Sequence, residues 1–144
     1  MATLHLEIVT PDARIFVGEV SGVLLPGAEG ELGILPQHTP LLTQLIPGEI
    51  HYVVEGKTHE LAVGHGFAEV TGTEVSVLTD LAVRETEIDE KAVEEALKRA
   101  EEALRTHTLI GEELEATEAA IARSIAQLKL KRRRTHISGM PPGI

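Results

Sequence analysis

Cysteine is absent from the 144-residue sequence. Neither a disulfide framework nor a zinc site built on thiolates is therefore possible, and a cysteine nucleophile is excluded. This composition fits a reducing compartment. Aromatic residues are almost as scarce, because Phe16, Tyr52 and Phe67 are the only three. Valine, leucine and isoleucine must therefore fill the core, which then offers no aromatic ligand pocket.

Long apolar segments are also missing. No stretch reaches the roughly 20 apolar residues that a helix needs to span a bilayer. The first residues lack the basic start and the apolar run of a secretion signal. We therefore expect a soluble protein, or one that is peripheral to a membrane.

Basic residues are few and unevenly distributed. The formal net charge of −10 argues against a nucleic-acid partner, because contacts to phosphates need a basic face. Residues 1–84 carry 11 acidic and 3 basic side chains, and residues 85–118 carry 12 acidic and 4 basic ones. Residues 119–144 carry 6 basic side chains and no acidic one. This C-terminal end is the part suited to an acidic partner surface.

The first half of the chain has the pattern of an all-β sandwich or barrel. Short apolar strands alternate with turn residues at intervals of roughly 8 to 12 residues. Glu55-Gly56 predicts a two-residue hairpin turn. This turn places Tyr52 opposite His59 and His51 opposite Glu60.

After Arg84 the apolar period changes from two to 3.6, which predicts helices. The first helix begins near Asp89, whose carboxylate is suited to capping it, and Thr86 is an alternative cap. The second helix is expected from about Gly111 to Arg133. The two predicted apolar faces consist of Val93, Ala96, Leu97, Ala100, Ala103 and Leu104 on the first helix, and Leu114, Thr117, Ile121, Ile125 and Leu128 on the second.

A short connection between two helices predicts an antiparallel hairpin. We therefore divide the chain into a β-sandwich over residues 1–84, a two-helix hairpin over 88–134 and a flexible tail over 135–144. Much of the first helix's apolar face is alanine, and burial contributes only about 0.8 kcal/mol per methylene-sized group. We expect a weakly held hairpin, which suits an element that exchanges between positions.

No motif of the sequence predicts an enzyme or a resident metal. The seven histidines lack the close spacing that places two imidazoles on one ion; they are residues 5, 38, 51, 59, 65, 107 and 136. Gly64-His65-Gly66 lies between two strands, so it predicts a bend or bulge with positive φ and no nucleotide cradle. No sequence motif places a nucleophile beside a base.

A basic cluster ends the second helix and consists of Lys129, Lys131, Arg132, Arg133 and Arg134. One interpretation is a solvated helix end that complements the helix dipole. The second is docking onto an acidic partner surface, which we favour because no acidic residue balances the cluster nearby. Anionic lipid is a third possible target.

The run from Pro26 to Thr43 combines turn, small and apolar residues in an unusual order. It resembles the signature loop of the epsilon subunit of the bacterial F-type ATP synthase. Three more segments resemble that family in the same order, so the resemblance covers nearly the whole chain. They are Leu6-Glu7-Ile8-Val9-Thr10-Pro11, Ala62–Val70 with Val75–Asp80, and Ile125-Ala126-Gln127-Leu128-Lys129.

The resemblance implies a sandwich of about ten strands that joins the gamma subunit to the ring of c subunits. The implied c-ring contact comprises Glu29, Gly30, Glu31, Leu32 and Gly33, and the implied gamma contact comprises His38, Leu41 and Leu42. The hairpin of such proteins leaves the sandwich, reaches the catalytic alpha and beta subunits and inhibits ATP hydrolysis. The protein is then a non-catalytic rotor subunit of the central stalk, bound to the cytoplasmic face of the bacterial membrane only through the complex.

Two positions depart from the family pattern. Some members bind ATP through an Asp-x-x-Arg motif at the start of the hairpin, and here Ala92 replaces the arginine that would face phosphate. We therefore expect no cofactor and no ATP sensing. At His65 the family usually has glycine. The alternative function is a free-standing β-domain adaptor whose basic helix docks onto an acidic protein or a lipid surface.

Overall fold

The computed structural model describes residues 2–138, with side chains described as far as Arg133. Ten strands precede two helices, and a short 3-10 helix, η1 (Glu85–Glu87), lies between the two regions. The strands are β1 (Leu4–Val9), β2 (Arg14–Val20), β3 (Gly22–Gly27), β4 (Gly30–Ile34), β5 (Leu41–Leu45), β6 (Gly48–Val54), β7 (Lys57–Val63), β8 (Gly66–Val70), β9 (Glu74–Thr79) and β10 (Ala82–Arg84). The helices are α1 (Glu90–Thr106) and α2 (Glu112–Ser138).

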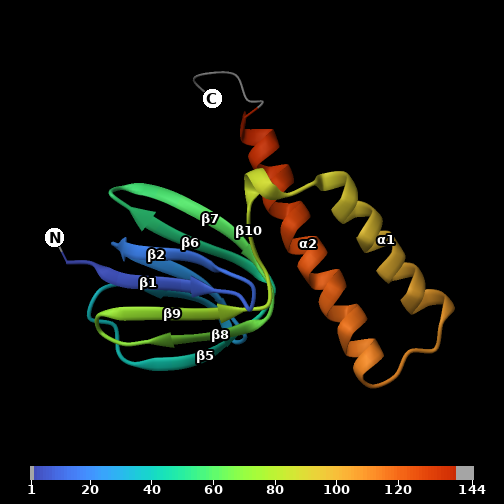
Figure 1. Cartoon of the computed structure of the whole chain (residues 1–144), viewed down its shortest axis with the longest axis horizontal. Helices are drawn as coiled ribbons and strands as arrows, with labels where there is room; N and C mark the ends of the chain where they lie inside the picture. Colours follow the sequence, from blue (N-terminus) through green and yellow to red (C-terminus); the bar gives the residue numbers. More distant parts are fainter. Residues whose placement is uncertain (1, 139–144) are drawn as a thin grey trace.

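The strands form two layers of one continuous sheet, so the predicted β-sandwich is confirmed (Figure 1). The strand order is β10-β7-β6-β3-β5-β8-β9-β1-β2, and β4 pairs with β3 outside this path. A single residue pair, Gly27 with Leu45, links β3 to β5 where the sheet passes from one layer to the other. Across the layers, the rings of Phe16 and Tyr52 lie 4.5 Å apart.

The core of the sandwich is aliphatic, as the composition predicts. Alternate residues of β1 are fully buried because successive side chains of a strand point to opposite faces. Tyr52 is the one aromatic residue among the buried members of this core. Its ring also stacks on His59, which lies opposite it on β7.

The predicted β6–β7 hairpin is confirmed, including its register. Tyr52 pairs with His59 and His51 pairs with Glu60. Glu55 and Gly56 have φ angles of 49° and 80°. Two successive positive φ values are typical of the type I′ turn, whose twist matches that of the flanking strands.

The predicted positive φ at Gly64-His65-Gly66 is wrong, because none of these residues has one. The two glycines are needed for space. A Cβ atom on Gly66 would lie 2.0 Å from the carbonyl oxygen of Leu78, and one on Gly64 would lie 1.9 Å from the Asp80 carboxylate. Close approach of a neighbouring strand and loop therefore explains this motif.

The helices form the predicted antiparallel hairpin (Figure 1). Asp89 caps α1, because the backbone N–H of Ala92 donates to its carboxylate at 3.1 Å. Helix α2 continues to Ser138, beyond the predicted end at Arg133. Residues 139–144 of the predicted flexible tail lie outside the described residues.

The predicted apolar face of α2 is wrong at Ile125, whose side chain is 52% exposed. Helix α2 packs against both α1 and the sandwich, so its contact surface is wider than one stripe (Figure 1). The residues that pack against the sandwich or pair with it recur at helical spacing, and they include Arg123, Ala126, Leu130 and Arg133. Ile125 lies beside this stripe.

A second, smaller core joins the hairpin to the sandwich. Leu130 is fully buried and packs with Ala62 of β7 and with Ile88, which precedes α1. Val83 and Val93 border this group. The small side chain of Ala62 leaves room for Leu130 on the outer face of the sheet. None of the described helices is long and apolar enough to cross a membrane.

Candidate functional site

Basic side chains of α2 contact acidic side chains from four other elements of the chain. Lys131 donates to Glu85 of η1 at 3.1 Å. Arg132 donates to two glutamates of α1, Glu90 at 2.8 Å and Glu94 at 2.9 Å. The remaining partners are on β6 and β7 and are bound by Arg133. Three members of the predicted basic cluster, Lys131, Arg132 and Arg133, therefore tie α2 to other parts of the chain.

Arg133 makes the most extensive of these contacts. Its Nη1 donates to Glu49 Oε2 at 2.9 Å, and its Nη2 donates to Glu49 Oε1 and, at 2.7 Å, to Glu60 Oε2. Burial by itself would raise the pKa of the Glu49 carboxyl, but hydrogen bonds from Arg133 and His51 lower it below its ordinary value. The hydrogen bond with Glu49 raises the pKa of Arg133 in turn. Both groups are held in their charged forms.

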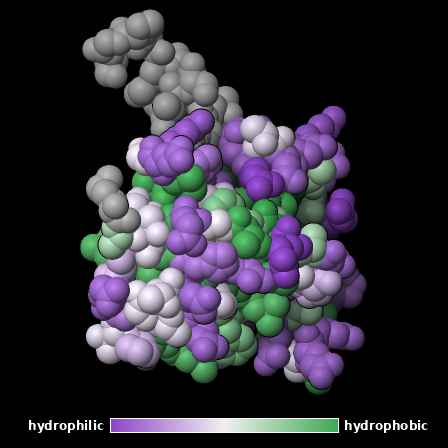
Figure 2. Space-filling model, turned by 60° about the vertical axis from the view of Figure 1, so that its left-hand side comes forward, coloured by the Kyte–Doolittle hydropathy of each residue, from purple (hydrophilic) through white to green (hydrophobic). Residues whose placement is uncertain are grey.

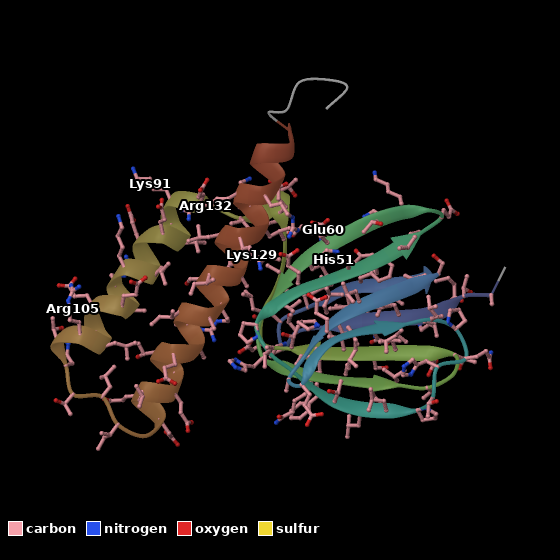
Figure 3. All side chains as sticks on the ribbon, turned by 180° about the vertical axis from the view of Figure 1, so that it is seen from behind. His51, Glu60, Lys91, Arg105, Lys129 and Arg132 are labelled. Atoms are coloured by element: carbon pink, nitrogen blue, oxygen red, sulfur yellow. The ribbon has the colours of Figure 1, made fainter. Side chains whose placement is uncertain are left out.

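The other two members of the predicted cluster are placed differently. Lys129 is exposed and makes no ion pair within the described part of the chain. It lies on the sandwich side of α2, whereas Arg132 lies toward α1 (Figure 3). The side chain of Arg134 lies outside the described residues.

The acidic partners of the cluster were missed by reading the sequence. Glu49 and Glu60 lie 84 and 73 residues from Arg133 along the chain. The predicted hairpin register contained part of the signal, since it placed His51 opposite Glu60 on one face of the sheet. A helix ending in arginine and a sheet face bearing two carboxylates are complementary only once they are packed together.

The predicted c-ring loop comprises the end of the turn between β3 and β4, at Glu29, and the first four residues of β4. Gly27 pairs with Gly30, so Ala28 and Glu29 form the tip, and Gly30 adopts a φ of 128°. Glu29, Gly30, Glu31 and Gly33 are exposed, whereas Leu32 packs partly against the core. The loop therefore presents two carboxylates and bare backbone to solvent.

A groove of about 710 Å³ separates this loop from α2. Its sandwich side includes Gly30, Glu31 and Ile46, and its helix side includes Ile125 and Lys129. The exposed Ile125 is thus part of a surface shared by the loop and the hairpin.

The two leucines of the predicted gamma contact lie on opposite faces of β5, and His38 precedes the strand. Leu41 packs against the core, whereas Leu42 is 70% exposed. His38 is half-buried in a turn, and its Nδ1 lies 2.7 Å from the carbonyl oxygen of Thr39. Its side chain therefore makes the local hydrogen bond expected of a turn residue.

Leu42 belongs to an exposed apolar patch that the sequence reading did not identify. Phe67 and Leu78 are directly opposed on β8 and β9, with exposed fractions of 51% and 56%. Leu42 and Phe67 lie on the neighbouring strands β5 and β8. We name Leu42, Phe67 and Leu78 the outer patch. Figure 2 shows hydrophobic areas, in green, between hydrophilic ones on one face of the molecule.

Comparison with known families decides the assignment. The sequence model of the ATP synthase delta/epsilon chain β-sandwich domain matches residues 3–85, and that of the long α-helix domain of the same chains matches residues 86–132. The chain belongs to the ATP synthase delta/epsilon family. As a member of this family, it is a non-catalytic subunit, as the sequence predicts.

Relatives of this ATP synthase subunit cover almost the whole chain. An ATP synthase epsilon chain of Laribacter hongkongensis is 43% identical over 141 residues, which cover 94% of this chain and 100% of the relative. One from Herpetosiphon aurantiacus is 43% identical over 134 residues, covering 91% and 98% of the two chains. The predicted resemblance is therefore confirmed.

Solved structures agree with this assignment. A chain in the Euglena gracilis mitochondrial ATP synthase structure of OSCP, F1 and c-ring superposes with a TM-score of 0.75 and 26% identity, covering 88% of this chain and 79% of that one. A chain in the Tetrahymena thermophila structure of the central stalk and c-ring has the same fold, with a TM-score of 0.54 and 17% identity over 92% and 96% of the chains. The family assignment favours a synthase subunit over a free-standing adaptor.

Proposed function

We propose that this delta/epsilon subunit lies in the central stalk of a proton-translocating F-type ATP synthase. It couples rotation of the c ring to the catalytic head, and its helical hairpin inhibits ATP hydrolysis. The observation that carries the regulatory part is the ion-paired anchoring of α2. Lys131 and Arg133, which hold the hairpin against η1 and the sandwich, are side chains that an acidic surface of the head would attract.

The strength of the anchor is compatible with release. Leu130 is the only fully buried large side chain that α2 contributes among the described residues. The exposed ion pairs of Arg132 join α2 to α1 and add nothing to the contact between the hairpin and the sandwich. A competing acidic surface of similar quality would therefore shift the hairpin toward an undocked position, since it replaces one set of carboxylates with another.

Attachment to the rotor requires surfaces that the hairpin leaves open. We assign the c-ring contact to the β3–β4 turn and the start of β4, over residues 29–33, which present carboxylates and backbone groups to polar loops. We assign the gamma contact to the outer patch, because a solvent-exposed cluster of three large apolar side chains gains most from burial. Leu41 supports this surface from the core side.

The subunit would then lie at the cytoplasmic face of a bacterial membrane as a peripheral part of the complex. The undocked hairpin would bind the catalytic alpha and beta subunits. We expect no ATP response. The side chain at position 92 is a methyl group that offers no cation to a phosphate, and the neighbouring Asp89 is engaged in capping α1.

Truncation tests the inhibitory function. Ending the chain after Gln127 removes Leu130 and the described anchoring residues Lys131 to Arg133, while the sandwich and its rotor contacts remain. We expect assembled synthase to hydrolyse ATP faster than the complex with the full chain, with unchanged subunit composition. The matched control is Arg105→Gln, a charge removed from the exposed end of α1 (Figure 3), which should leave hydrolysis unchanged. Equal hydrolysis by the truncated and full-length complexes would disprove inhibition.

A further inference from the structure

Three side chains of the β6–β7 hairpin form a set of metal-ligand type on the outer face of the sheet. His51 pairs with Glu60 across the strands, and Glu49 lies two residues from His51 on the same face. One donor atom from each of the three lies within 4.8 Å of the others. His51 Nε2 and Glu49 Oε1 are 3.0 Å apart. Two ligands on a tetrahedral zinc ion lie about 3.3 Å apart.

A positively charged group already lies among these donors. The Arg133 guanidinium binds both Glu49 and Glu60. The space between these two carboxylates therefore stabilises a positive charge. The set is more than an acidic cluster, because His51 contributes an imidazole. A histidine with carboxylates suits zinc and related transition-metal ions better than calcium or magnesium.

The β6–β7 hairpin holds Glu49, His51 and Glu60 in place without help from α2. Seven consecutive residue pairs hold β6 against β7, and Ile50 and Leu61 anchor the two strands in the sandwich core. If α2 leaves, Glu49 and Glu60 lose their shared counter-ion and face each other as like charges. A divalent ion would remove that repulsion and take the place of the guanidinium.

We propose that Glu49, His51 and Glu60 bind a divalent transition-metal ion such as Zn²⁺ in competition with Arg133. The ion and the docked helix exclude each other, so the ion favours the undocked hairpin and docking weakens ion binding. The regulatory half of this inference rests on the proposed function. Ion binding by the three side chains does not.

Titration calorimetry of the full chain with Zn²⁺ tests the site. We expect Arg133→Gln to bind one ion at least about tenfold more tightly than the native chain, because a docked Arg133 lowers the fraction of binding-competent molecules. Arg132→Gln is the matched control, since it removes the adjacent charge without touching the three ligands. It should bind like the native chain.

Two further variants identify the ligands. In the Arg133→Gln background, His51→Gln and Glu60→Gln should each weaken Zn²⁺ binding at least about tenfold. The other six histidines remain in every variant and provide the background. Circular dichroism reports whether each variant is folded. The site does not exist if the folded Arg133→Gln variant binds Zn²⁺ no more tightly than the native chain. It does not exist either if neither His51→Gln nor Glu60→Gln weakens Zn²⁺ binding.

Amide hydrogen exchange in α2 tests the competition. Zn²⁺ should accelerate exchange in α2 of the native chain, and His51→Gln should abolish that effect. An unaltered exchange rate in α2 despite bound Zn²⁺ would overturn the competition. The two proposals fail separately, because a zinc site can exist even if truncation leaves ATP hydrolysis unchanged, and truncation can raise hydrolysis even if no zinc binds.

Discussion

The sandwich and the helical hairpin are stabilised in different ways. Seventeen buried apolar residues form the sandwich core, whereas Ala62, Ile88 and Leu130 are the buried members of the core that joins it to the hairpin. Helix α1 contains no buried residue among those described. Ion pairs also join α2 to η1, α1 and β7. The sandwich is therefore expected to stay folded as a unit, whereas the hairpin can leave its docked position.

The largest expected effect comes from a cavity in the sandwich. Leu6→Ala removes a fully buried side chain from the main core. We expect the free energy of unfolding of the sandwich to fall by about 3–5 kcal/mol. Urea denaturation followed by circular dichroism measures it. A loss below about 1 kcal/mol would show that the core relaxes around the change and is less rigid than its burial implies.

A matched cavity beneath the hairpin should act locally. Leu130→Ala also removes a fully buried leucine, but from the small core between α2 and β7. We expect the free energy of undocking to fall by about 3 kcal/mol while the sandwich keeps its stability. Faster amide exchange confined to the hairpin checks this result. Equal acceleration in β1 and β9 would contradict the separation of the two regions.

The smallest expected effect concerns pH. The pKa of Glu49 in the folded protein lies below its ordinary value of 4.5, so its contribution to docking is complete above about pH 4.5 and is lost as the pH falls below it. Hydrogen bonds to charged groups contribute about 1.5–3 kcal/mol, which sets the upper size of the effect. Amide exchange in α2, corrected for intrinsic rates, should show this loss in the native chain. In the Glu49→Gln variant, α2 should be docked less stably at neutral pH, and lowering the pH below 4.5 should cause no further loss of docking.

Local patterns predicted much of the fold. The Glu55-Gly56 turn was sufficient to pair His51 with Glu60, because a two-residue loop sets the register of both strands. Asp89 was identified as the helix cap from its side-chain chemistry and its place before the apolar stripe. These predictions succeeded because each depends on residues that are close in sequence.

Predictions about surfaces were less successful. Ile125 fits the apolar stripe of an isolated helix, but α2 has two neighbours, and Ile125 lies in the groove beside the stripe that faces the sandwich. Gly64 and Gly66 were expected to supply positive φ, whereas their small size is what Asp80 and Leu78 require. In each case the deciding contact comes from a different element.

The amino-acid sequence by itself determined the family, the β-sandwich, the helical hairpin and the opposite charges of its two ends. These properties follow from local periodicity, turn chemistry and composition. Only the tertiary structure decided where the basic end is directed. The carboxylates that neutralise Arg133 come from two strands more than 70 residues away, and a pairing across that distance becomes visible only when α2 lies on the sheet.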